Sequence, residues 1–286
     1  MSIAKPLKWF NVIGYGVGDM ANNLVFAMGT FFLLNYYTDV AGIPAAAAGT
    51  MLAAVRIYDA AMDVVAGRVV DRTSTRWGRF RPFLLAGALP LMLLSVAVFS
   101  VPSGWSVTAK LGYACVTYAL LGTAYSFVNI PYGALATVMT QNPRERARLG
   151  TSRTFMAVCT SSFLAMVVGP SAASLKGEAL QAWLTQLTLG LAVLGTVLYV
   201  FCFATTREIV EREVEHPRLD DSLGTLIGNP PLLMLCAAAL CVLTGLASST
   251  ASSVGGMREA SPSDLRQWTA TPRFAQISVC MYGVST

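Results

Sequence analysis

The 286-residue sequence predicts an all-α, polytopic membrane protein. Hydrophobic residues make up 55% of the chain and charged residues only 12%, which is more apolar surface than a soluble domain of this size can bury. The apolar residues gather in segments of about 20 residues or more, long enough to cross a bilayer as helices. The basic residues lie mainly in short stretches between these segments.

Seven apolar segments are expected to cross the membrane, near residues 10–37, 44–67, 82–101, 108–130, 150–173, 180–204 and 230–250. We therefore divide the chain into an N-terminal six-helix transmembrane bundle over 1–205, a cytoplasmic linker over 206–228, a seventh transmembrane helix over 229–252 and an irregular tail over 253–286. The tail has no apolar span and no clear periodicity. Either a disordered end or a frameshifted one accounts for it.

The basic residues indicate how the chain is oriented. When the loops are assigned alternately, thirteen Lys and Arg fall on one side and only Lys110 and Lys176 on the other. Since Lys and Arg favour the cytoplasmic side, we expect a cytoplasmic N-terminus in the inner membrane. The apolar stretch after Lys5 and Lys8 is too long for a signal-peptide core, so the first helix should stay in the membrane. The same loops explain the net charge of +5 without a nucleic acid partner.

The first apolar segment contains the run Gly14-x-Gly16-x-Gly18. A dinucleotide-binding fingerprint would require a preceding strand, and none is predicted here. We therefore expect these glycines to let another helix approach closely.

One face of the same segment carries Asp19, Asn22, Asn23 and Phe26, which recur at helical spacing. A carboxylate and two amides can bind the hydroxyl groups of a sugar, and an aromatic ring can stack on its C–H bonds. Asp19 either takes part in such a site or only caps a partner helix.

The second segment carries three charges, Arg56, Asp59 and Asp63, within roughly 60° of one another around the helix. Each charge at mid-membrane costs roughly 2.5–3.5 kcal/mol unless it is paired or reaches water. A structural Arg56–Asp59 pair would explain two of them and leave Asp63 without a partner. The alternative is a helix face that lines a polar cavity.

The fourth segment contains a proline, Pro131, next to Tyr125, Ser126 and Asn129. Proline removes a backbone donor, so we expect the helix to kink or end there, either as a packing bend or as a cavity wall. At the edge of the fifth segment, Arg153 either snorkels to the interface or reaches inward.

The loop after the second segment is rich in arginine. The pattern Gly67-x-x-x-Asp71-Arg72, followed by Arg76, Gly78 and Arg79, resembles the loop that joins helices 2 and 3 of major facilitator transporters. Together with the preceding helix, RIYDAAMD…DRTSTRWGRFRPFLL resembles the glycoside–pentoside–hexuronide:cation symporters, the family of the melibiose permease. The resemblance covers roughly residues 8–255 and implies a major facilitator-type bundle.

The resemblance also implies a function, the symport of a sugar or glycoside with a proton or sodium ion by alternating access, without a cofactor. The implied cation-coupling residues are Asp59, Asp63 and Ser126, the two aspartates being metal ligands only if the ion is sodium. The implied substrate-binding residues are Asp19, Asn22, Asn23, Tyr125, Asn129 and Arg153. The implied conformational loop consists of Gly67, Asp71, Arg72, Arg76, Gly78 and Arg79.

Three positions depart from the melibiose permease. Asn129 replaces a sugar-binding aspartate, Gly133 replaces a tryptophan that stacks on the galactoside, and Met62 replaces an asparagine beside the cation. These changes argue against a galactoside and, because a thioether is a poor ligand for a hard cation, favour protons over sodium.

Two other functions were weighed. The spacing of Asp59, Asp63, Gly67 and Asp71 partly matches the metal-binding motif of CDP-alcohol phosphotransferases, but Thr75 stands where that motif needs its last aspartate, so no enzyme is predicted. The other is a non-transporting remnant or half-size scaffold. Family members have twelve helices, and a cavity between two halves needs the C-terminal half that is missing here.

Overall fold

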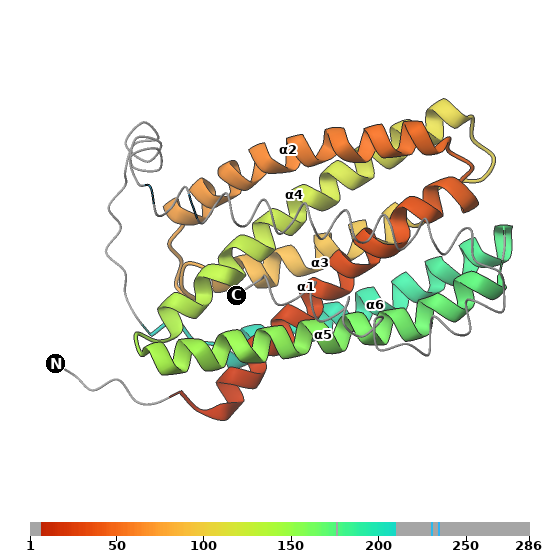
Figure 1. The fold of residues 1–286 in the computed structure, drawn as a ribbon. Coiled ribbons are helices and arrows are strands. Elements are labelled where there is room, and N and C mark those ends of the chain that lie inside the picture. Colours follow the sequence, from red (N-terminus) through yellow and green to blue (C-terminus); the bar gives the residue numbers. More distant parts are fainter. Residues whose placement is uncertain (1–6, 176, 210–229, 231–233, 235–286) are drawn as a thin grey trace. The chain divides into compact units, whose positions relative to one another are not determined.

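The computed structural model describes residues 7–175, 177–209, 230 and 234. The predicted seventh helix (229–252), tail (253–286) and most of the linker (206–228) therefore lie outside the described residues. Within the described part, six α-helices and no strand are present, which confirms the predicted all-α class (Figure 1). The six helices all belong to one unit, Met1–Arg212.

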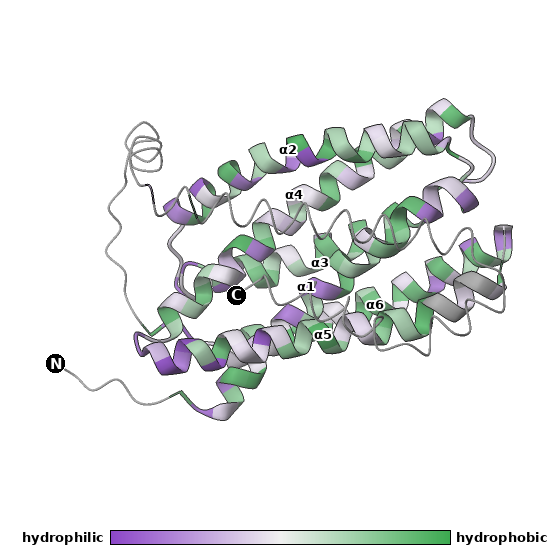
Figure 2. Cartoon of the chain, viewed as in Figure 1, coloured by the Kyte–Doolittle hydropathy of each residue, from purple (hydrophilic) through white to green (hydrophobic). Residues whose placement is uncertain are grey.

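The helices follow the predicted apolar segments. Their bounds are α1 Trp9–Asn35, α2 Ala45–Arg72, α3 Arg81–Val98, α4 Val107–Met139, α5 Pro143–Ser174 and α6 Gly177–Thr205, with a π-helical turn, η1, over Tyr36–Val40 after α1. All except α2 are long and apolar enough to cross a membrane. The 28-residue α2 is less apolar because it carries charges, visible as a hydrophilic patch midway along it (Figure 2).

Two helix boundaries differ from the sequence prediction. The predicted end of the fourth span at residue 130 is wrong, since α4 continues through Pro131 to Met139. One missing backbone donor does not outweigh the packing of Tyr132, Leu135 and Val138, which are buried beyond the proline. Helix α5 begins at Pro143, before its apolar span, because the Asn142 side chain caps it by accepting from the Arg144 N–H at 3.0 Å.

The helices pack in a definite order. Helix α1 packs on α5 and α6, α3 on α4 and α6, and α2 mainly on α4. The spatial order is therefore α2–α4–α3–α6–α1–α5, with α1 crossing between the α2–α4 pair and the α5–α6 pair (Figure 1). Helices distant in sequence thus become neighbours, and α1 contacts elements from both edges of the bundle.

The glycines of α1 make this central position possible and confirm the predicted close packing. A methyl group at Gly14 would overlap Thr205 of α6, and one at Gly16 would overlap Ser152 of α5. At Gly18 the added carbon would lie 2.6 Å from a ring carbon of Tyr132 and 2.7 Å from the Cys202 sulfur. The absent side chains therefore set the distances between α1 and its three neighbours.

This packing predicts that Gly18→Ala lowers the stability of the bundle by about 1–3 kcal/mol, the usual cost of overpacking a dense interior. Gly29→Ala on the same helix is the matched control, because no atom lies within 4 Å of its added methyl group. We expect the control to be neutral or stabilising by up to about 1 kcal/mol. Thermal unfolding in detergent micelles measures both, and equal effects would contradict the packing argument.

Candidate functional site

A cavity of about 200 Å³ opens between α1, α2 and α4. It brings together all three predicted cation-coupling residues with two of the predicted substrate-binding residues. Its polar lining consists of Thr30, Arg56, Asp59, Asp63, Tyr118, Tyr125, Ser126 and Asn129. Phe26 of α1 also lines it, and the Phe26 and Tyr125 rings stack with centroids 6.1 Å apart. The charged face of α2 therefore lines a polar cavity, as predicted.

Asp63 is held from α4. The Ser126 hydroxyl donates to its Oδ1 at 2.5 Å, across the contact between α2 and α4. A carboxylate oxygen and a hydroxyl oxygen are thus already adjacent, and both are ligands that a hard cation accepts.

Asp59 is less completely satisfied. Its Oδ2 lies 4.0 Å from Nη1 of Arg56, so the pair considered from the sequence does form, with a long separation. Its Oδ1 is buried and has no hydrogen-bond partner among the described residues. A buried carboxylate oxygen without a partner is costly, so this position favours a proton or a cation.

The close approach of Asp59 to α4 depends on Gly122, which sequence reasoning missed. A methyl group at Gly122 would overlap the Asp59 carboxylate. Gly122 lies four residues before Ser126, on the same face of α4. Both carboxylates of α2 therefore contact the same turn of α4. Asp63 accepts from the Ser126 hydroxyl, and Asp59 packs against Gly122.

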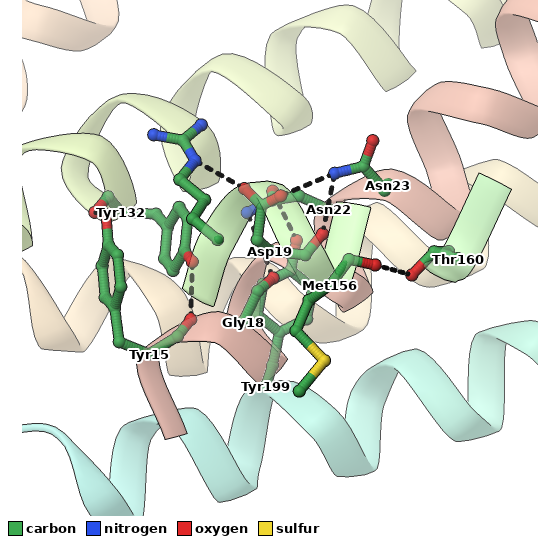
Figure 3. Close-up of polar contacts among 10 residues, drawn as sticks. Tyr15, Gly18, Asp19, Asn22, Asn23, Tyr132, Met156, Thr160 and Tyr199 are labelled. Atoms are coloured by element: carbon green, nitrogen blue, oxygen red, sulfur yellow. Dashed lines mark hydrogen bonds and ion pairs between the residues drawn. The ribbon is translucent and has the colours of Figure 1, made fainter. Parts of the chain in front are cut away.

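A second polar cluster lies between α1, α5 and α6 (Figure 3). It is centred on Asp19, which is only 3% exposed. Its Oδ1 accepts from Nε of Arg153 at 2.7 Å, and its Oδ2 accepts from Nδ2 of Asn23 at 2.8 Å. Arg153 therefore reaches inward to the carboxylate, which decides between the two orientations left open by the sequence. Asn22 is held separately, because its Oδ1 accepts from the hydroxyl of Tyr199 on α6 at 2.7 Å.

Two tyrosines support the arginine. The Tyr15 and Tyr132 rings stack with centroids 4.7 Å apart, and the Tyr132 hydroxyl donates to the Tyr15 carbonyl at 2.6 Å (Figure 3). The Arg153 guanidinium lies 5.3 Å from the centre of the Tyr132 ring. Tyr15 precedes Asp19 by one turn, a spacing that could have identified it, whereas nothing in the sequence of α6 singles out Tyr199.

The predicted substrate-binding residues thus fall into two groups. Tyr125 and Asn129 line the cavity with Asp59 and Asp63, while the group formed by Asp19, Asn22, Asn23 and Arg153 is not part of that lining in the described bundle. Gly133 lies beside the second group, since a methyl group there would be 3.9 Å from Nη1 of Arg153. Helix α1 contributes residues to both groups.

The predicted conformational loop is partly helical. Gly67, Asp71 and Arg72 belong to the last turns of α2, and Arg76, Gly78 and Arg79 lie between α2 and α3. Arg79 binds Asp71 through Nη2 and Oδ1 at 3.2 Å and donates from Nε to the Val70 carbonyl at 3.2 Å. Thr75 and Gly78 exchange backbone hydrogen bonds of 3.2 and 3.0 Å, which close the turn. The loop is therefore tied to the end of α2.

A family model described as MFS/sugar transport protein matches residues 14–254. The chain belongs to this family. Similar relatives support this assignment. A glucuronide carrier protein homolog of Escherichia coli (strain K12) is 54% identical over 250 residues, which cover 87% of this chain and 55% of the relative.

Two further Escherichia coli (strain K12) relatives are similar. The putative glycoside/cation symporter YagG is 40% identical over 228 residues, 79% of this chain and 49% of the relative. The inner membrane symporter YicJ is 38% identical over 199 residues, 70% of this chain and 43% of the relative. The chain thus spans about half the length of the curated relatives it matches. The family, the six helices and their hydropathy together establish a multi-pass, all-α membrane protein.

The Asp19–Arg153 pair predicts that removing the arginine alone destabilises the bundle more than removing both charges. Arg153→Ala leaves a buried carboxylate without its cation, so we expect a loss of about 3–5 kcal/mol, and adding Asp19→Asn should recover much of it. Arg144→Ala, at an exposed position on the first turn of the same helix, should stay within about 0.5 kcal/mol. Thermal unfolding in micelles measures all three, and no recovery in the double variant would contradict the pairing.

Proposed function

We propose that this bundle is part of a secondary active transporter that symports a sugar or glycoside with a cation by alternating access. The observation that carries the proposal is the cavity in which Asp59, Asp63 and Ser126 meet, in a chain of a sugar-transporter family. Ionisable residues within a membrane bundle generally mark an ion or substrate pathway. The names of the relatives, which include carriers and symporters, support it.

Asp59, Asp63 and the Ser126 hydroxyl are proposed to bind the coupling ion. A sodium ion would be held by Oδ1 of Asp59, which has no hydrogen-bond partner among the described residues, together with oxygens of Asp63 and Ser126, since hard cations prefer such ligands. A proton needs no such shell of oxygen ligands. We favour the proton, since Met62 offers no hard oxygen ligand.

The sugar is proposed to bind between the two polar clusters. Phe26, Tyr125 and Asn129 face the cavity, and Asp19 lies about two turns before Phe26 on α1, paired with Arg153 of α5. The Arg153 side chain is 29% exposed and that of Asp19 only 5%, so the guanidinium is the accessible end of the pair. An arginine presented in this way suits an anionic sugar. The relative named as a glucuronide carrier homolog makes a glucuronide the first substrate to test.

Transport is proposed to require a second half. The matched part of this chain covers only 55% and 49% of two relatives, and alternating access needs two bundles that rock about a shared site. Among the described residues, nothing covers α2 at Ile57, which is 77% exposed. A non-transporting remnant is not favoured over this proposal, because the relatives that the chain matches are named as carriers and symporters.

The location is proposed to be the inner membrane with a cytoplasmic N-terminus. Basic residues gather at one set of helix ends, at Lys8, in the 72–81 loop and at the start of α5. Such clusters remain on the cytoplasmic side. The energy for uptake then comes from the membrane potential, since one positive charge that moves inward supplies roughly 2.3 kcal/mol per 100 mV. Cation and sugar each strengthen the binding of the other by the same factor.

The coupling role predicts that Asp59→Asn or Asp63→Asn, in a carrier with both halves, abolishes uphill accumulation and leaves downhill exchange. The substitution removes the charge that the ion neutralises, while the sugar contacts remain. Uptake of radiolabelled glycosides into membrane vesicles measures both, with a glucuronide and the matching glucoside in the panel. Asp39→Asn, an exposed aspartate after α1, is the control, and normal accumulation in the two α2 variants would refute the proposal.

The choice of ion has its own test. We expect uptake in sodium-free buffer to follow an imposed pH gradient and to be indifferent to sodium when no gradient is present. Met62→Asn places an amide oxygen beside Asp63 and should create sodium dependence, because it adds a hard ligand to the shell. Uptake by the wild-type carrier that follows sodium and ignores pH would overturn the preference for protons.

A further inference from the structure

Glu208 follows α6 in a charged segment to which sequence analysis assigned no chemistry. Its carboxylate accepts three backbone hydrogen bonds from consecutive residues at the start of α3. Oε2 accepts from the Arg79 N–H at 2.8 Å, and Oε1 accepts from the N–H groups of Phe80 at 2.8 Å and Arg81 at 3.0 Å. Glu208 and Arg81, which are 127 positions apart in the chain, thereby meet at the start of α3.

This contact satisfies a general need. The first N–H groups of a helix have no partner within the helix, and the Phe80 side chain that precedes α3 makes no capping hydrogen bond. A carboxylate at this end is also favoured by the helix dipole. Glu208 therefore supplies, from the segment after α6, the cap that the local sequence of α3 lacks.

Gly78 makes room for the carboxylate. Its φ of 107° lies in a region that other residues rarely adopt, and a methyl group there would be 2.5 Å from the carboxyl carbon and Oε1 of Glu208. The glycine of the loop motif thus leaves the space that the Glu208 carboxylate occupies.

The two helix ends hold each other reciprocally. Arg81, at the start of α3, donates from Nη2 to the Phe203 carbonyl near the end of α6 at 2.7 Å and lies 4.4 Å from the Phe203 ring centre. The Trp77 ring meets the same Phe203 ring edge-on at 6.2 Å. Ile209 donates to the Val138 carbonyl of α4 at 3.0 Å. The segment 206–209 is therefore fastened to α3 and α4.

We propose that Glu208 is a positioning residue that joins the segment after α6 to the 73–80 loop, so that the loop and the start of the linker move as one body. The contact itself rests on the geometry above. Its consequence for transport rests on the proposed function together with the conformational role that the family resemblance implies for this loop.

Amide hydrogen exchange of the full 286-residue chain in nanodiscs tests the contact. Glu208→Ala should speed exchange at Arg79, Phe80 and Arg81 by about 10–100-fold, because hydrogen bonds to a charged acceptor are lost. Exchange in the middle of α3 should not change. Glu178→Ala, an exposed glutamate in the first turn of α6, is the matched control. Unchanged exchange at the three amides would overturn the proposal.

Two more variants separate the contact from a general loss of stability. Glu208→Gln keeps one acceptor oxygen and replaces the other with a donor, so protection should survive in part at one side of the carboxylate and vanish at the other. Gly78→Ala should resemble Glu208→Ala, and the double variant should be no worse than either alone, since both remove the same contact. Additive effects would contradict the shared contact.

In a carrier with both halves, Glu208→Ala should lower the maximal rate of uptake severalfold without changing the KM, because neither Glu208 nor the loop lines the cavity. Faster exchange at the three amides with an unchanged rate of uptake would overturn the role in transport. Neither result bears on the coupling ion, since the proposed function is tested by accumulation in the Asp59 and Asp63 variants.

Discussion

The bundle depends on how it compensates charges placed among apolar helices. Asp19 receives Arg153 from α5 and Asn23 from its own helix, so both carboxylate oxygens are satisfied in a buried position. Asp63 receives only a hydroxyl, and Asp59 keeps one oxygen without a partner in the described residues. The first carboxylate is therefore compensated within the bundle, whereas the other two keep oxygens that the proposed coupling ion would bind.

Helix α1 connects these two arrangements. Its glycines let α4, α5 and α6 approach closely, and the same helix carries Asp19 toward α5 and Phe26 toward the cavity. A dense interior transmits small displacements instead of absorbing them. An α1 held by three neighbours therefore links the proposed sugar contact at Asp19 to the cavity of the proposed ion site, which α1 lines about two turns further along, at Phe26.

Charged side chains also connect the helix ends near the α2–α3 loop. Arg79 forms an ion pair with Asp71 at the end of α2, and Arg81 donates to a carbonyl of α6. Glu208 accepts from backbone N–H groups at the start of α3. The arginines that indicate orientation from the sequence thus also fix the loop. A motif that reads as a cluster of positive charge is, in three dimensions, a set of helix-end contacts.

The sequence by itself determined the helices, because apolar length and low charge leave a segment few alternatives to crossing the membrane as a helix. It also singled out the carboxylates of α2, since charges within an apolar segment are conspicuous, whereas the family resemblance added Ser126. The sequence did not show that α4 continues past Pro131 or that α5 begins at Pro143, because capping and packing act beyond the apolar window. Only the tertiary structure decided that Arg153 meets Asp19, that Tyr199 holds Asn22, that Gly122 admits Asp59 and that Glu208 caps α3. Each of these contacts joins residues far apart in the chain, and helical periodicity carries no information about which face of one helix meets which face of another.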